Sequence, residues 1–282
     1  ELRERTGAGM MDCKKALVDA GGNLDDAADL LRKSGQAKAD KKAGRTAAEG
    51  RVVIASDDRQ AVIVEINSET DFVAKDENFA AFAQAVADAV LRGEATDVEA
   101  LAGETLADGR TIEAARTDLV AKVGENISLR RFARLPADGT LGTYSHLDRI
   151  GVLVALEGGN PDLAREVAMH VAAANPACID EDGVPGELLE RERRIFAEQA
   201  AQSGKPAAIA ERMVSGRVAK FLKEITLLGQ PFVRDPDITV GQLVARAGAK
   251  IRGFVRFEVG EGIAKKQENF AQEVMAQINQ RA

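Results

Sequence analysis

The sequence is poor in aromatic residues, cysteine and histidine, and each shortage excludes a class of function. It has no Trp, one Tyr and ten Phe, so a surface that stacks nucleic-acid bases on rows of aromatic rings is not expected. Cys13 and Cys178 are too far apart in the sequence to form a CxxC metal site, and two cysteines are no disulfide framework, which favours a reducing, cytoplasmic location. His146 and His170 form no helical pair that would hold a metal ion.

Phosphate-binding motifs are missing as well. Gly7-Ala8-Gly9 begins like the GxGxxG pattern, but Asp12 stands at the third glycine position, where a carboxylate repels a pyrophosphate. Gly204-Lys205 is followed by Pro206, where a P-loop needs Ser or Thr. We therefore expect no catalytic residues, no metal and no cofactor, and a function that depends on binding another macromolecule.

The overall composition is that of a globular protein. The 282 residues are 45% hydrophobic and 29% charged, enough for about two modest domains with their own cores. A net charge of −7 argues against nonspecific binding to nucleic acid or to a membrane surface. The longest apolar run, residues 150–156, is too short to cross a bilayer.

The first 35 residues are typical of a small three-helix unit. Residues 1–6 are typical of the end of a helix, so we expect the natural chain to begin upstream. A second helix is predicted over residues 10–20, and a third begins after the N-cap Asn23 and ends at Gly35. The unit resembles the ubiquitin-associated fold, which does not by itself imply ubiquitin binding. Residues 36–50 are small and basic; we interpret them as a linker, with a helix as the alternative.

The pattern then changes to a period of two, which predicts the first half of a core over residues 51–138. A β-hairpin is expected from strands 52–55 and 61–66, followed by a helix from about Asp76 and a second helix over residues 112–123. A strand over residues 127–135 completes this half. We expect Ile127, Leu129, Ala133 and Leu135 to share one face of that strand.

The same order of elements recurs in residues 139–178 and 227–262. A hairpin of strands 140–146 and 150–156 precedes an apolar helix over 162–174, and residues 244–251 repeat the pattern of residues 120–127. We infer an α+β protein whose two-part core consists of small antiparallel sheets covered by helices.

An inserted helical segment interrupts the second half at residues 179–226. Its pattern predicts an antiparallel helical hairpin that bends near Pro206 and projects from the body; the alternative is a hairpin folded back on its own sheet. A further helical module is expected over residues 263–282.

One exposed-looking segment stands out before the helix at Asp76. Thr70, Asp71, Phe72 and Val73 follow a strand directly, and Lys75 provides an opposite charge. On composition alone, Phe72 would pack its loop against the sheet, which is the common fate of an isolated aromatic residue.

Eight long motifs change that interpretation. They are RTGAGMMDCKKAL at 5–17, TDFVAKD at 70–76, VGENISLRR at 123–131, RIGVLVAL at 149–156, AMHVAA at 168–173, SGKP at 203–206, LLGQPFV at 227–233 and GFVRFEVGEG at 253–262. In this order they make the sequence similar to the bacterial elongation factor Ts family along nearly its whole length. The main departure is a few extra residues near 101–110, which we expect to form a loop.

The resemblance implies a guanine-nucleotide exchange factor that binds elongation factor Tu, and a helical hairpin used for homodimerisation. It implies no enzyme activity, no direct contact with nucleic acid and no membrane attachment. It also assigns partner-binding roles. The segment expected to disturb the partner's magnesium site is Thr70, Asp71, Phe72 and Val73, and other contacts are expected at Arg3, Met10, Met11, Lys14, Val123, Gly124 and His146.

Two rival functions stay open at this point. A ubiquitin-like adaptor would bind its target through residues 1–35 alone. A metabolic α+β enzyme would need a convergent set of acids or histidines, which the sequence does not contain.

Overall fold

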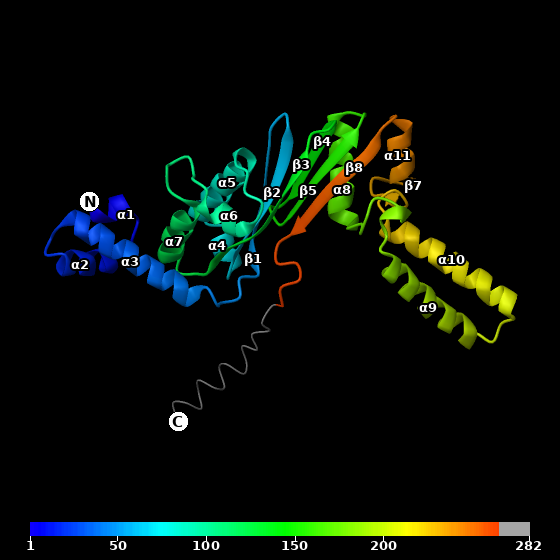
Figure 1. Cartoon of the computed structure of the whole chain (residues 1–282), viewed down its shortest axis with the longest axis horizontal. Helices are drawn as coiled ribbons and strands as arrows, with labels where there is room; N and C mark the ends of the chain where they lie inside the picture. Colours follow the sequence, from blue (N-terminus) through cyan, green and yellow to red (C-terminus); the bar gives the residue numbers. More distant parts are fainter. Residues whose placement is uncertain (265–282) are drawn as a thin grey trace, which may run out of the picture.

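The protein is elongated, with a helical unit at one end, two sheets in the middle and a helical hairpin at the other end (Figure 1). The structure is a computed structural model and describes residues 1–264. The expected C-terminal helical module at 263–282 therefore lies almost wholly outside the described residues. Helices and small antiparallel sheets alternate along the chain, so the predicted α+β class is confirmed. Among residues 1–264, no helix is both long and apolar enough to cross a membrane.

The N-terminal unit contains α1 (Leu2–Thr6), α2 (Met10–Asp19) and α3 (Leu24–Lys42). The side chain of Asn23 accepts hydrogen bonds from the amides of Asp25 and Asp26, which is the predicted N-cap of α3. The unit has a small core of its own, made by Leu2, Cys13, Ala16 and Ala27.

The predicted end of the third helix at Gly35 is wrong, because α3 continues to Lys42. Gly35 is buried where α3 packs on the helix that contains Ala121: a Cβ atom at position 35 would lie 3.6 Å from the Cβ of Ala121, in ordinary van der Waals contact. Ala39, one turn further on, belongs to the core of the first half. The first part of the expected linker is thus a helix, because tertiary packing outweighs the weak preference of a single glycine to stop one.

The first half of the core contains β1 (Glu49–Ser56), β2 (Gln60–Ser68) and β3 (Ile127–Pro136) in one antiparallel sheet of order β1-β2-β3. Between β2 and β3 lie α4 (Asp71–Ala74), α5 (Glu77–Arg92), α6 (Val98–Gly103) and α7 (Ile112–Val123). The predicted apolar face of α5 is buried against the sheet. The extra residues near 101–110 are not all loop, since α6 extends to Gly103.

A β-bulge changes which face of the sheet the side chains of β3 occupy. Leu129 pairs with Ile66, whereas Arg131 pairs with Glu65, so Arg130 is the extra residue. The bulge inverts the alternation of side chains beyond it. Ile127 and Leu129 therefore lie in the first half's core, while Ala133 and Leu135 pack in the cluster between the two sheets. The prediction that these four residues share one face is wrong for that reason.

The second half repeats the plan with β4 (Thr140–His146), β5 (Ile150–Glu157) and β8 (Lys250–Glu258) in the order β4-β5-β8. Helix α8 (Pro161–Ala174) covers this sheet, and α11 (Val240–Arg246) precedes β8. A small ribbon of β6 (Pro231–Phe232) and β7 (Asp235–Thr239) lies before α11.

His170 of α8 is buried, and its Nε2 is hydrogen-bonded to the side chain of Gln230 at 2.9 Å, so it is a core residue with its hydrogen bond satisfied.

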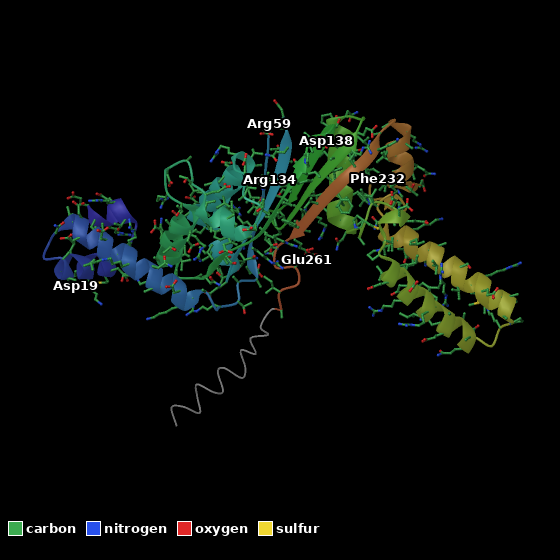
Figure 2. All side chains as sticks on the ribbon, viewed as in Figure 1. Asp19, Arg59, Arg134, Asp138, Phe232 and Glu261 are labelled. Carbon is green, nitrogen blue, oxygen red and sulfur yellow. The ribbon has the colours of Figure 1, made fainter. Side chains whose placement is uncertain are left out.

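The two sheets pack face to face through a third apolar cluster, which contains Val52, Ile63, Leu153 and Phe257. Gly151 allows this close approach: a Cβ atom there would lie 2.5 Å from a methyl group of Val52. The order of layers is therefore helices, sheet, sheet, helices. Figure 2 shows Arg59 and Asp138 together at one end of the sheets and Glu261 at the opposite end.

The insertion consists of a 3-10 turn (Glu181–Gly183), α9 (Gly186–Gln202) and α10 (Ala207–Ile225). The two helices pack on each other, with the rings of Phe196 and Phe221 edge to face at 6.4 Å. They project from the body as an antiparallel hairpin (Figure 1), as predicted, so the alternative of a hairpin folded back on its own sheet is excluded.

Candidate functional site

The segment between β2 and α5 is shaped by two helix caps. The hydroxyl of Thr70 accepts a hydrogen bond from the amide of Val73 and starts the single turn of α4. The carboxylate of Asp76 accepts from the amides of Asn78 and Phe79 and starts α5. Two N-caps in such close succession force a short helix, a turn and a second helix. The segment is therefore a rigid corner and not a loose loop.

Within this corner, α4 has one buried and one exposed side. Ala74 is buried and Val73 packs against the core of the first half, so α4 lies on β1 and β2. Phe72 points the other way, and its side chain is 81% exposed. The interpretation that Phe72 packs its loop against the sheet is therefore excluded. Exposure of an aromatic ring on an ordered helix leaves its apolar surface in contact with water, which is unfavourable for the isolated protein.

Asp71 gives this surface a negative charge beside the ring. Its carboxylate pairs with the Lys75 ammonium at 2.7 Å, one helical turn away, and it is about half exposed. The hydrogen bond from Lys75 holds the pKa of Asp71 below its usual value, and the positive charge of Arg149 adds to this effect. Asp71 is thus ionised at neutral pH.

Glu125 holds the corner in place. Its two carboxylate oxygens accept from the amide of Thr70 at 3.0 Å and from the Thr70 hydroxyl at 2.6 Å. Glu125 follows Gly124, which ends α7 in the left-handed conformation with φ 79°. The structure thus brings Val123 and Gly124 beside the Thr70 segment, although they are far apart in the sequence. Asn126 adds a second contact between the two segments, since its backbone amide donates to the Glu69 carboxylate at 2.6 Å.

No role for Glu125 is predicted from the sequence. It lies inside the motif at residues 123–131, so its position was marked, but no local pattern reveals that it binds a threonine in another loop. Its carboxylate makes two charge-assisted hydrogen bonds, which are stronger and more directional than neutral ones.

The expected contacts in the N-terminal unit share one surface. Met10 and Met11 are 69% and 72% exposed. Arg3, Met10 and Lys14 line a shallow, open pocket of about 580 Å³, together with Leu17 and others. The structure therefore brings Arg3, Met10 and Lys14 together, with Met11 adjacent on α2.

The last expected contact, His146, is exposed at the end of β4. Its Nδ1 lies 3.3 Å from the hydroxyl of Tyr144, and the two rings are stacked with centroids 6.3 Å apart. The turn after His146 touches the other half of the core: the amide of Val52 donates to the carbonyl of Asp148 at 2.7 Å. His146 is thus fixed relative to β1, on which α4 lies.

Chemically, this region combines an apolar ring with charged and hydroxyl groups. Within residues 1–264, no group of three or more His, Cys, Asp or Glu side chains is placed to hold a metal ion. The polar groups beside Phe72 are paired with one another: Asp71 with Lys75, and Glu125 with Thr70. What the region offers is an apolar ring, a carboxylate and rigid support.

Three known proteins and one family profile that match this chain carry the same name. A family profile described as "Elongation factor TS" matches residues 69–261. A protein named elongation factor Ts from Thioalkalivibrio sulfidiphilus is 63% identical over 281 residues, which covers 98% of this chain and 96% of that protein. Proteins of the same name from Legionella pneumophila (strain Paris) and Methylococcus capsulatus are each 56% identical, over 99% of this chain and 96% of their own length.

Proposed function

The chain belongs to the elongation factor Ts family, and we propose that it binds elongation factor Tu carrying GDP and promotes release of the nucleotide, so that GTP can bind. Membership of this family makes it a translation elongation factor. We place its action in the cytoplasm, with elongation factor Tu as its partner and without a cofactor of its own.

The observation that carries the proposal is the exposed ring of Phe72 on a rigid corner. The side chain is 81% exposed, and the backbone beneath it is fixed by Glu125 and by the buried Ala74. A ring held in this way needs no reordering to enter a gap between elements of a partner, so binding loses little conformational entropy. Asp71 would enter beside it as a charge that competes for the groups ordering the partner's magnesium ion.

Thermodynamic linkage explains how such a protein accelerates exchange without a nucleotide site. If the factor weakens GDP binding tenfold, GDP must weaken binding of the factor tenfold, which is about 1.4 kcal/mol of coupling. The factor therefore has to bind the vacant GTPase better than the loaded one. Every contact that forms only with the vacant state contributes to this difference.

Phe72 supplies part of that coupling. Burying a Phe side chain gives about 1.5–3 kcal/mol, which corresponds to one or two decades. The remainder must come from the wider contact surface. We assign it to Arg3, Met10, Met11 and Lys14 in the N-terminal unit, to Val123 and Gly124 beside the corner, and to His146 in the second half.

The direct test is replacement of Phe72 by alanine. We expect GDP release from elongation factor Tu to slow by about 10- to 100-fold, with the rate measured by stopped-flow fluorescence of a labelled GDP. The melting temperature should stay unchanged, because the side chain is exposed. Phe72→Leu is the matched control and should keep most of the activity, since it keeps an apolar side chain on the same corner. Wild-type release rates with Phe72→Ala would refute the role of the ring.

The helical hairpin has a separate proposed role in self-association. Ile209 is 47% exposed on α10, and the hairpin touches the body mainly at its base. A second copy of the hairpin would cover such half-apolar helical faces in the manner of a coiled coil. We therefore propose homodimerisation through α9 and α10.

The adaptor alternative has one supporting feature, the exposed surface of Met10, Met11 and the shallow pocket beside them. It requires residues 1–35 to act alone. Against it, α3 runs on to Lys42 and packs on α7, so the unit is not cleanly separable. A pull-down with residues 1–48 distinguishes the two: we expect this fragment to retain only a small part of the affinity of the full chain for elongation factor Tu.

A further inference from the structure

Leu147 occupies an unfavourable position in the turn between β4 and β5. Its side chain is 80% exposed, and among the described large apolar residues only Phe72 is more exposed. Its backbone has φ 54° and that of Asp148 has φ 55°. Two successive residues in the left-handed region are typical of a tight turn that favours Asn or Gly, because a leucine gains no local hydrogen bond there. Leu147 therefore lowers the stability of the isolated protein in two ways: its backbone is in a disfavoured conformation, and its apolar side chain is in water.

The turn itself is firmly held. The carbonyl of Asp148 accepts from the amide of Val52 at 2.7 Å, and the carboxylate of Asp148 pairs with Arg51 at 2.8 Å. Arg149 pairs with Glu49 at 2.7 Å. Leu147 is therefore presented to solvent from an anchored backbone and not from a loose loop.

The turn also lies at the same end of β1 as the corner that carries Phe72. Glu49, the partner of Arg149, pairs across the sheet with Ser68, two residues before Thr70. Helix α4, which carries Asp71 and Phe72, packs on β1 as well. The two most exposed large apolar residues of the described part of the chain thus come from different halves of the core, and both belong to segments at the same end of β1.

We infer that Leu147 is a second apolar contact with the GTPase, on the surface that continues from Asp71 and Phe72 across the joint between the sheets. This inference rests on the proposed function. The protein that covers Leu147 is elongation factor Tu, because an apolar residue anchored beside the corner of Phe72 is covered when that corner binds its partner. Since α4 and the β4–β5 turn are both anchored to β1, Phe72 and Leu147 engage as one rigid unit, and Leu147 adds mainly to the lifetime of the complex.

The test is Leu147→Asn, which removes the apolar side chain and suits the backbone of the turn. We expect an unchanged or higher melting temperature, because Asn tolerates the left-handed region. We also expect dissociation from nucleotide-free elongation factor Tu to become about tenfold faster, measured by surface plasmon resonance. Leu147→Met is the matched control, since it keeps an apolar side chain, and its dissociation rate should stay within about twofold of the wild type.

Two outcomes overturn the inference. Wild-type dissociation of Leu147→Asn would show that no partner covers the side chain, and equal losses in Leu147→Asn and Leu147→Met would assign the effect to the turn instead. Either outcome leaves the proposed function standing if Phe72→Ala still slows GDP release. If the wild-type protein does not bind elongation factor Tu, the proposed function fails, and the inference fails with it.

Discussion

The two halves of the core follow one plan and differ most after their second strand. In the second half, β5 ends at Glu157, and Gly158, Gly159 and the capping residue Asn160 lead directly into α8. In the first half, β2 ends at Ser68, and residues 69–76 build the corner that carries Phe72 before α5 starts. Both helices begin at a side-chain cap, but only the first half places an extra turn, α4, before that cap. This turn packs on β1 and β2 through Val73 and Ala74, and it also carries the exposed Phe72, to which we assign the proposed function.

A second difference lies before the third strand. The first half uses α6 and α7 to cover its sheet, whereas the second half sends α9 and α10 away from the body and has only the short α11 before β8. The insertion starts and ends at one place, because the amide of Ala177 donates to Ile225 and the amide of Leu227 donates to Cys178. An insertion closed at its base adds a surface without changing the sheets.

The halves are also joined by a buried charge. Glu65 of β2 is completely buried and accepts hydrogen bonds from Arg130 at 2.7 Å, Arg131 at 2.6 Å and the amide of Gly260 at 2.8 Å. Gly260 follows β8, so one carboxylate of the first half holds the end of the last strand of the second. We call this contact of Glu65 with Arg130, Arg131 and Gly260 the Glu65 joint. We expect the two halves to keep their relative positions only while the joint is intact.

The largest expected effect comes from breaking that joint. Glu65→Gln removes the charge and replaces one accepting oxygen by an NH2 group that faces other donors. Arg130 loses its paired carboxylate, and Arg131 keeps only Glu261. We expect a loss of about 3 kcal/mol in the free energy of unfolding and a less cooperative transition as the halves separate, measured by urea denaturation. Asp108→Asn is the control: its pair with Arg110 is half exposed, so the loss should stay below about 1 kcal/mol. Equal losses in the two variants would contradict the role of the joint.

The same joint predicts an acid dependence of the wild type. Burial raises the pKa of Glu65, but the hydrogen bonds from Gly260, Arg130 and Arg131 outweigh it and hold the pKa below the unfolded value of 4.5. The folded state therefore binds fewer protons than the unfolded state, and the stabilisation present above pH 4.5 is lost as the pH falls through the folded pKa. Urea titrations between pH 3 and 7 should show this loss, and Glu65→Gln should lack it.

A smaller effect is expected from loosening the corner of the first half. Glu125→Ala removes both hydrogen bonds to Thr70, at an expected cost of about 2 kcal/mol in stability. Phe72 would then be presented in several orientations. We expect GDP release from elongation factor Tu to slow about tenfold, with a smaller change in affinity for the vacant GTPase.

Asp97→Ala is the matched control for that experiment. It removes a carboxylate that caps α6 in the same half and should cost about 1 kcal/mol without slowing exchange. If Asp97→Ala slowed release as much as Glu125→Ala, general destabilisation would explain both results.

The smallest effect on exchange is expected from the second half's insertion. Deleting residues 187–222 leaves the base closed at Cys178 and Thr226. The GDP release rate should stay within about twofold of the wild type, because the hairpin is remote from Phe72. Analytical ultracentrifugation should show the loss of self-association, and an unchanged sedimentation distribution would exclude dimerisation through the hairpin.

Much of this architecture could be predicted from local patterns. The hairpins, the helices and the repeated order of elements follow from periods of two and 3.6, and the caps at Asn23, Asp76 and Thr70 act within a few residues. The surface around Phe72 was proposed from the family motifs, because composition alone favoured a packed ring. Its assignment as a contact with the GTPase stays a prediction.

What the amino-acid sequence determined by itself is thus most of the longer elements, because each is encoded by neighbours along the chain. The short α4, α6 and the β6–β7 ribbon were not predicted, since they span too few residues to show a period. Only the tertiary structure decided that α3 passes Gly35, that the bulge at Arg130 divides β3 between two cores, and that Glu125 and Glu65 hold residues far away in the chain. A hydrogen-bonding or packing partner across the fold leaves no periodic signal, since an acid or a small residue acquires its distant partner only when the chain has folded.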